Sequence, residues 1–329
     1  MDRRRAILAL ASCSGALAVA PALSQPAKPR RIGLLSPLGQ GDPQTQSRLA
    51  AFEQELGRLG WKKGADVLLD YRFADGHATR AGQLAKELLD LHPEVVVAFG
   101  TSSAAALRQQ TLSIPIVFAQ VVDPVAAGFV TNLARPEGNI TGFTQFDSSI
   151  GEKWLQAIKE CAPKVNRVAL VFDPTNPAWT AHVRAVESAA KKFAVKLVPV
   201  SAKDAADLEK QITSFAASPN GALVIVPGAV TTTHSKVIVS LAARHRLPAV
   251  YPYSFHTANG GLMSYGVDLL SLYRGAASYV DRILKGAKPS DLPIQQPTRF
   301  ELTVNLKTAR ALGITVPQSL LQQADKVIQ

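Results

Sequence analysis

The sequence predicts an α/β protein made of two doubly wound lobes, each a parallel sheet covered by helices on both faces. Three observations predict this fold. Short, continuous apolar runs recur along the chain, stretches with helical spacing of apolar residues separate them, and the alternation comes as two similar sets. The 329 residues, of which 47% are hydrophobic and 19% charged, suffice for two domains with ample cores.

Residues 1–24 differ from the rest of the chain and predict a signal peptide. Arginines at positions 3–5 precede an apolar run over residues 6–23 that ends in small side chains. The run is rich in alanine and short for a membrane span, which disfavours a transmembrane anchor. The segment Leu10–Cys13 resembles a lipid-attachment site, but the apolar run continues past it, so a lipid anchor is less favoured. We therefore expect export to the periplasm, through either the general secretory (Sec) pathway or the twin-arginine pathway.

One cysteine, Cys161, remains after removal of the signal, so the mature protein has no internal disulfide and depends on its core. Cys161 lies at an apparent helix end, where we expect it to fill the core.

The net charge is +11, and it falls to +9 once the three arginines and one aspartate of residues 1–24 are removed. Lysines and arginines are dispersed along the chain, which favours a solvated basic surface and no nucleic-acid partner.

The first set of elements builds the first lobe. Apolar stripes with helical spacing, such as Leu49, Phe52 and Leu56, lie between its apolar runs. Gly60 and Pro93 stand where two of these helices should stop. The expected strands cover residues 32–36, 67–71, 95–99 and 114–119.

The second set follows a polar, glycine-rich link over residues 135–149. Its expected strands cover residues 168–172, 195–200, 222–227 and 247–251. A second passage between the lobes is expected at 251–266, then a helix over about 268–285 and a proline-rich third link at 285–300. The tail should hold a strand over 302–306 and one or two helices.

These links define the expected domains. The first lobe should comprise residues 30–143 plus about 258–287, and the second residues 144–257 plus about 288–329. In open parallel sheets, ligands bind outside the carboxyl ends of the strands. Two facing lobes would therefore line one cleft with the residues that follow their strands.

The strand at 95–99 runs through Gly100 into the hydroxyls of Thr101 and Ser102, where a helix begins. A helix start offers free N–H groups to an anion, so a solute carboxylate could bind there. An ammonium group could pair with Asp123 or Asp173, which also follow strands. The alternative reading is local: Thr101 or Ser102 caps the helix, and the two aspartates shape turns.

Motifs for chemistry are missing from the sequence. The segment beginning Gly39-Gln40-Gly41 lacks the third glycine of a dinucleotide fingerprint, and no phosphate loop occurs. No G-x-S-x-G elbow occurs, and the six histidines are scattered without metal-ligand spacing. We therefore expect no cofactor, no metal, no catalytic residue and no enzyme activity. An exported serine-type α/β hydrolase using Ser102 or Ser103, or a ligand-sensing receptor core, remains the alternative.

Two stretches carry a family resemblance: "IPIVFAQVVDPVAAGFVTNLARPEGNITGF" (114–143) and the segment from "GGLMSYGVDLL" to "VPQSLL" (260–321). On them the chain resembles the substrate-binding proteins of ABC importers with the type I periplasmic-binding fold, in the group with tryptophan- and tyrosine-binding members. Residues 30–37 and 57–76 fit it as well, so the resemblance extends over nearly all of 30–328.

The resemblance implies three hinge crossovers between the lobes, closure over a ligand, and delivery to a membrane permease and its ATPase. It also implies ligand contacts, to which the strand-end argument adds Gly228; the full set is Ser36, Thr101, Ser102, Gln120, Asp123, Asn176, Gly228 and Tyr253. We expect a monomeric binding protein for a small solute, an amino acid or other carboxylate, aromatic ones included.

Overall fold

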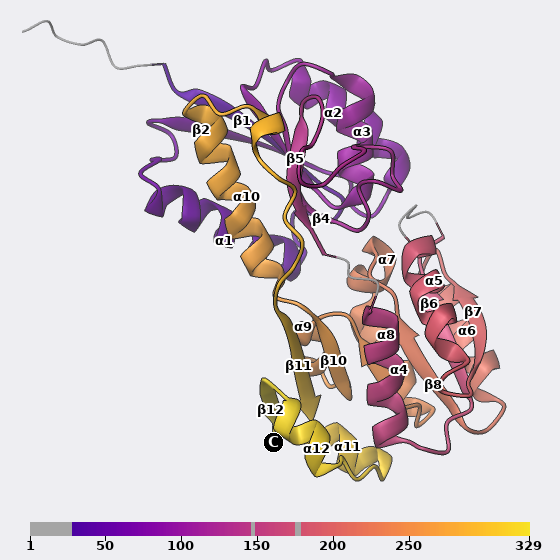
Figure 1. The fold of residues 1–329 in the computed structure, drawn as a ribbon. Coiled ribbons are helices and arrows are strands. Elements are labelled where there is room, and N and C mark those ends of the chain that lie inside the picture. Colours follow the sequence, from indigo (N-terminus) through magenta and orange to yellow (C-terminus); the bar gives the residue numbers. More distant parts are fainter. Residues whose placement is uncertain (1–27, 146–148, 175–178) are drawn as a thin grey trace, which may run out of the picture.

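Two separate sheets organise the chain into two lobes that meet at a narrow waist (Figure 1). The computed structural model describes residues 28–329 except 146–148 and 175–178. The predicted signal peptide and Cys13 lie outside the described residues. In the described part of the chain, no helix has the length and apolar character needed to cross a membrane.

The first lobe has a five-stranded, fully parallel sheet in the order β2-β1-β3-β4-β5. Helices α1 and α10 pack together on one face, and α2 and α3 on the other (Figure 1). Its elements are β1 (Arg30–Ser36), α1 (Pro43–Arg58), β2 (Val67–Phe73), a 3-10 turn (Ala78–Arg80), α2 (Ala81–Leu89), β3 (Val95–Phe99), α3 (Thr101–Gln110), β4 (Ile116–Val121), β5 (Ile140–Thr144), α10 (Leu269–Leu284) and a second 3-10 turn (Pro289–Asp291).

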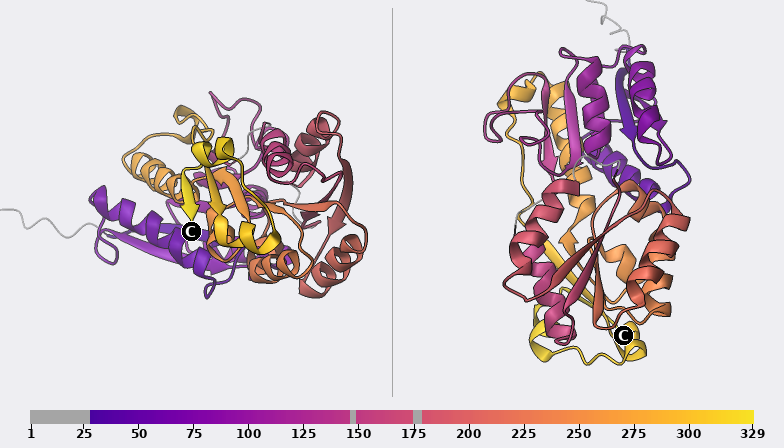
Figure 2. Two further views of the ribbon diagram at one scale, coloured as in Figure 1. Left: turned by 90° about the horizontal axis from the view of Figure 1, so that it is seen from below. Right: turned by 90° about the vertical axis from the view of Figure 1, so that its right-hand side faces the viewer.

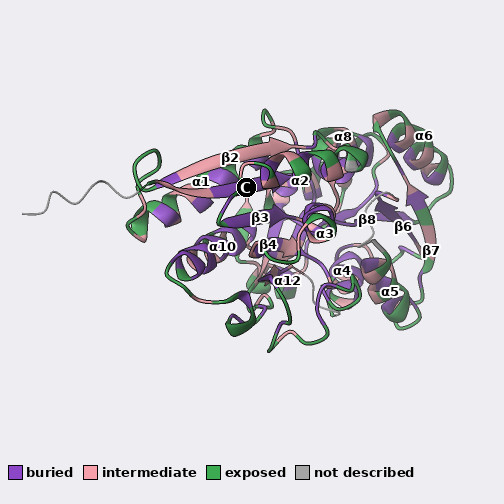
Figure 3. Ribbon diagram, turned by 90° about the horizontal axis from the view of Figure 1, so that it is seen from above, coloured by how far each residue is buried: buried purple, intermediate pink, exposed green. Residues whose placement is uncertain are grey.

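The continuous apolar runs form strands because both faces of the sheet are covered. In β3, Val95 and Val97 join the core under α1 and α10, whereas Val96 and Ala98 join the core under α2 and α3. Figure 3 shows this arrangement as buried strands at the centre with exposed residues on the outer faces of the helices. The alternation of side chains along a strand thus feeds two cores from one apolar run.

The second lobe has a seven-stranded sheet in the order β12-β11-β10-β9-β8-β6-β7. Its neighbouring strands are parallel except for the antiparallel pair β10 and β11. Its elements are α4 (Ile150–Cys161), β6 (Arg167–Phe172), α5 (Trp179–Ala190), β7 (Lys196–Ser201), α6 (Ala205–Ala216), β8 (Gly221–Ile225), α7 (Ala229–Thr233), α8 (Ser235–Arg244), β9 (Ala249–Tyr251), α9 (Ser254–Ala258), β10 (Met263–Val267), β11 (Phe300–Asn305), α11 (Leu306–Leu312), α12 (Gln318–Gln323) and β12 (Lys326–Ile328).

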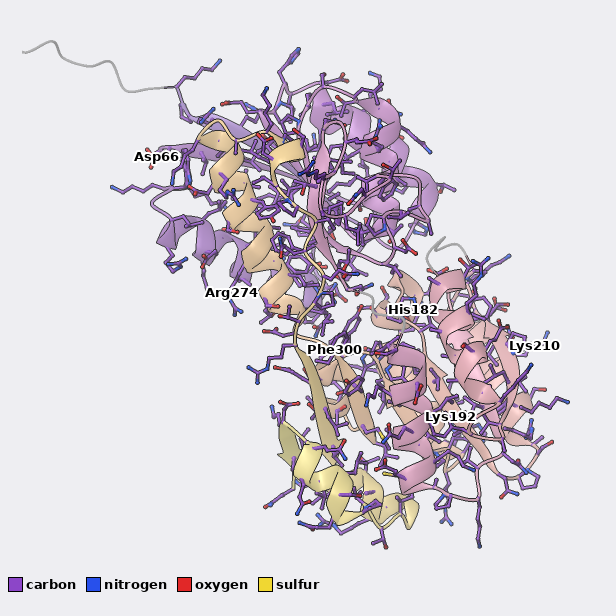
Figure 4. The ribbon with its side chains drawn as sticks, in the orientation of Figure 1. Asp66, His182, Lys192, Lys210, Arg274 and Phe300 are labelled. Atoms are coloured by element: carbon purple, nitrogen blue, oxygen red, sulfur yellow. The ribbon has the colours of Figure 1, made fainter. Side chains whose placement is uncertain are left out.

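The chain passes between the lobes three times: between β5 and α4, between β10 and α10, and between α10 and β11. The right-hand view of Figure 2 shows the lobes end to end around these crossings, and Figure 4 places Phe300 at the waist. The prediction put the second crossing within 251–266, but those residues hold the helix α9 and most of β10, and β10 is a strand of the second sheet. Of the stretch 258–287, only α10 packs on the first sheet, because Met263 and Ser264 pair with β9.

Two helices of the second lobe approach each other unusually closely. A Cβ atom added at Gly151, the second residue of α4, would lie 2.4 Å from the carbonyl carbon of Ala185 in α5. The absent side chain of Gly151 therefore allows the backbones of α4 and α5 to touch.

Cys161 ends α4 and is buried among apolar side chains of the second lobe. Burial raises the pKa of the Cys161 thiol to about 12, so the group stays protonated and unreactive.

Basic side chains lie apart on the outer surface, as Arg274 on the first lobe and Lys210 on the second show in Figure 4.

Candidate functional site

A pocket lies between the lobes, where the carboxyl ends of strands from both sheets meet. Its empty volume, which includes space open to solvent, is about 710 Å³. Its lining follows the strand ends, as expected for open parallel sheets. From the first lobe these residues include Pro37, Leu38, Ala74, Gly76, Gly100, Thr101, Ser102, Gln120 and Val122; the remainder includes Gln145, Asp173, Pro227, Gly228, Ala229, Thr232 and Tyr253.

The structure brings together five of the eight residues proposed as ligand contacts. Thr101, Ser102 and Gln120 line the pocket from the first lobe, and Gly228 and Tyr253 line it from the second. They come from the ends of four different strands, so the chain reaches one place from segments far apart in sequence.

Two other proposed contacts do not line the pocket. Ser36 is buried at the end of β1, where its hydroxyl accepts a hydrogen bond from the Leu38 amide at 3.2 Å and so shapes the turn. The Asp123 carboxylate accepts hydrogen bonds from the amides of Val125 and Ala126 at 3.1 and 2.9 Å. Asp123 thus serves the turn chemistry weighed as its alternative role. The last one, Asn176, lies outside the described residues.

The start of α3 presents backbone donors to the pocket. Gly100 caps this helix with φ 81° and ψ 166°, a conformation that glycine adopts readily, and no side chain caps the helix there. The Thr101 hydroxyl is engaged elsewhere, since it accepts a hydrogen bond from the Val122 amide at 3.3 Å. Ser102 is partly exposed in the pocket. The first-turn amides and the Ser102 hydroxyl therefore suit an anionic group.

A hydrogen-bonded network crosses from the first lobe to the chain segments at the waist. The Gln120 amide donates to the Tyr253 hydroxyl at 2.9 Å, and that hydroxyl donates to Gln145 at 2.6 Å. The Tyr273 hydroxyl donates to the Gln120 carbonyl oxygen at 2.8 Å. Burial raises the pKa of Tyr253 above its ordinary value, so its hydroxyl remains a donor.

Gln120 holds its place in this network with a backbone φ of 69°, in the left-handed region that favours glycine. The strand β4 shifts register against β5 at this point. Both the nitrogen and the oxygen of the Gln120 amide bond to tyrosines, so this side chain links Tyr253, which lines the pocket, to Tyr273.

We expect Tyr253→Phe to lower the free energy of unfolding by about 1 to 2 kcal/mol, because Gln120 and Gln145 lose a buried partner. Tyr251 provides a matched control: its buried hydroxyl has no partner among the described residues. Tyr251→Phe should therefore leave stability within about 0.5 kcal/mol of the wild type. Urea unfolding of both variants measures the difference, and equal effects would refute the role of the network.

Sequence reasoning missed three polar residues of the pocket: Arg48, Gln145 and Thr232. Arg48 stands beside the apolar stripe of Leu49, Phe52 and Leu56 in α1, and a charged residue in that position looks like a surface residue in the sequence. Asp173, considered for an ammonium group, does line the pocket and is 3% exposed. Its position directly after β6 was the signal that identified it.

The described part of the lining lacks the partners a serine nucleophile requires. No histidine and no cysteine line the pocket beside Ser102. The buried Ser103 hydroxyl does not line it either. Among the described residues, no group of three or more histidine, cysteine, aspartate or glutamate side chains could hold a metal ion.

Comparison with known protein families gives a match over most of the chain. The family described as "ABC transporter substrate binding protein" matches residues 42–328. The curated "Tyrosine-binding protein" of Clostridioides difficile is 24% identical over 273 residues, which cover 83% of this chain and 78% of that relative.

Solved structures share the fold. The "ABC domain in complex with L-Trp" from Streptococcus pneumonia has a TM-score of 0.85 and 23% identity, and the match covers 92% of this chain and all of that one. A "conserved domain protein" from Vibrio cholerae has a TM-score of 0.86 and 26% identity, covering 91% and 100% of the two chains. Both support two doubly wound lobes of the type I periplasmic-binding fold, as predicted.

Proposed function

Because this chain belongs to the ABC transporter substrate-binding proteins, and so delivers a small solute to an ABC importer, we propose that its solute is a small carboxylate. Amino acids, aromatic ones included, are the first class to test. One observation carries the proposal: a pocket between two lobes has the uncapped start of α3 on one side and Asp173 on the other.

The chemistry of this lining suits a zwitterion. A carboxylate would accept hydrogen bonds from the first-turn amides of α3 and from Ser102, where the helix dipole favours negative charge. An ammonium group would face the carboxylate of Asp173. Pro37, Leu38 and Ala229 offer apolar contact to the rest of the solute. The printed names of two similar proteins, tyrosine-binding and in complex with L-Trp, agree with this class.

Binding couples to movement of the lobes in this proposal. Three crossings link the lobes, and such links allow hinge closure around a ligand. Tyr253 reaches across to Gln120 and Gln145 beside the pocket, so its network would hold the two sides in register as they close.

Four further properties belong to the proposal. The protein is exported to the periplasm by its N-terminal segment, acts as a monomer, binds no nucleic acid and catalyses no reaction. The lining supports the last point, since neither histidine nor cysteine accompanies Ser102 among the described lining residues. Mass spectrometry of the bound solute before and after incubation tests it: a converted solute would favour the hydrolase.

A melting screen tests the solute class. We expect amino acids and other small carboxylates to raise the melting temperature in a concentration-dependent way, because they bind only the folded state. Sugars and purines serve as controls. Shifts confined to those neutral compounds, with none for carboxylates, would overturn the proposed class.

Ser102→Ala should weaken binding of the best carboxylate about tenfold, the cost of one hydrogen bond to a charged group. Ser103→Ala is the matched control, because the neighbouring Ser103 hydroxyl is buried and does not line the pocket. It should leave the affinity unchanged. Isothermal titration compares the two, and equal affinities for both variants would limit Ser102 to a structural role.

A further inference from the structure

Arg48 is an unusual member of the pocket lining. Arg48 is only 6% exposed, and its guanidinium lines the pocket from α1. Its Nε and Nη2 atoms are buried and have no hydrogen-bond partner among the described residues.

No carboxylate of the described residues forms an ion pair with Arg48. Other arginines of the first lobe do have acidic partners, such as Arg31 with Asp70 at 3.0 Å and Arg72 with Glu87 at 2.8 Å. The Arg48 guanidinium instead lies near Tyr273: the ring centroid is 5.9 Å away, and the two side chains share a hydrogen bond, which is neutral on the tyrosine side and supplies no counter-charge. A buried, unpaired charge is costly to a folded protein, so its place at a binding pocket requires an explanation.

We infer that Arg48 pairs with the anionic group of the solute. This inference rests on the proposed function and deepens it, because it makes a negative charge on the solute the condition for tight binding. The guanidinium presents its donors in a planar fork that matches a carboxylate in two parallel hydrogen bonds. The start of α3 lines the same pocket and adds amide donors.

This pairing explains why Arg48 is buried at the pocket and why no carboxylate of the described residues pairs with it. The solute carboxylate supplies the counter-charge that the protein lacks, and burial strengthens the pair by excluding water. A neutral solute of the same shape would leave the guanidinium unpaired and would therefore bind much more weakly. Arg48 thereby makes the protein bind a carboxylic acid more tightly than the corresponding amide.

The test uses matched acids and amides as probes: L-tyrosine, L-tryptophan and benzoate, each with its amide, and phenyl phosphate as a different anion. By isothermal titration, we expect the full protein to bind at least one acid about 100-fold more tightly than its amide. Arg48→Met should lose about 100-fold in affinity for the acid and little for the amide, and Arg48→Lys should fall between.

Arg108→Met is the matched control. Arg108 also lies in a helix of the first lobe with a buried, unpartnered Nε atom, but it lines a different depression beside Phe129. This variant should bind the acids as the wild type does. A ligand-free measurement separates a binding role from a structural one: Arg48→Met should melt at the wild-type temperature or above, because it removes an unpaired buried charge.

The outcomes are distinct. Acid binding by Arg48→Met within threefold of the wild type, or equal wild-type affinities for acids and amides, overturns the inference and leaves the proposed carboxylate class standing. Binding of phenyl phosphate alone, abolished by Arg48→Met, supports the inference and overturns the carboxylate class. A ligand-free Arg48→Met protein that melts several degrees lower overturns the inference, as does a wild type that binds none of the anions.

Discussion

Gly151→Ala is expected to lower the free energy of unfolding by about 3 kcal/mol, through overpacking against a backbone that cannot yield easily. The new Cβ would lie 2.4 to 2.5 Å from three backbone atoms of Ala185 and Val186 in α5. Relief would require α4 and α5 to separate, which would open the core formed by Trp154, Leu155 and Val186.

Gly82→Ala is its control, because Gly82 is likewise the second residue of a helix, α2, and a Cβ there would meet nothing within 4 Å. Alanine should raise stability at that position by about 0.5 kcal/mol, since it restricts the unfolded chain and favours the helix. Urea unfolding of both variants measures the contrast. A Gly151→Ala protein as stable as the wild type would show that the two helices are not in close contact.

Protonation of His256 alone is expected to lower the free energy of unfolding by about 3 kcal/mol as the pH falls from 6.5 to 4. Burial lowers the pKa of His256 to about 4 from the ordinary 6.5, and the positive charge of Arg48 acts in the same direction. The contact of Nδ1 with the Tyr253 carbonyl at 3.2 Å opposes the shift. The ring is also stacked on Phe255, with centroids 4.1 Å apart.

Stability falls with pH because His256 takes up its proton at different pH values in the folded and unfolded protein. Below pH 6.5 the unfolded chain gains a proton on His256, whereas the folded protein does not until about pH 4. Protonation therefore favours unfolding throughout this window, and the loss levels off below the folded pKa.

Comparing His256→Gln with the wild type over this window isolates the contribution. The variant should lose about 3 kcal/mol less stability between pH 6.5 and 4, whatever its stability at neutral pH. His77→Gln at an exposed position is the control and should keep the wild-type pH dependence. Parallel profiles for the wild type and His256→Gln would contradict a buried, neutral His256.

Most of the fold could be predicted because its strands are buried on both faces. The runs predicted at 95–99 and 168–172 are β3 and, one residue longer, β6. The second crossing was misplaced because β10 contains polar and glycine residues, such as Ser264 and Gly266, yet pairs on both edges within the sheet. Its strand character comes from these partners rather than from its own pattern. The short β12 was missed for the same reason, since Val327 gains its place by pairing with Val304.

The site could be predicted in part for a similar reason. Thr101 and Ser102 follow a strand, and the topology brings strand ends to one cleft. Asp123 follows a strand equally well, but its carboxylate is used by its own turn. Arg48 could not be recognised, because its distinguishing property is the lack of a carboxylate partner in three dimensions. That property depends on which side chains surround α1 and leaves no mark in local spacing.

The third crossing also determines when each lobe can be completed during synthesis. Trp61, just after α1, donates a hydrogen bond at 2.8 Å to Asp281 of α10, which the ribosome adds 220 residues later. Until then the α1 side of the first sheet lacks half of its cover, and the second sheet lacks β11 and β12. Neither lobe is a contiguous stretch of chain, so a nascent polypeptide keeps apolar surface uncovered almost to its end. Such a chain stays unfolded long enough to be handled by chaperones, and removal of its last 60 or so residues, which takes away both α10 and β11, would damage both lobes together.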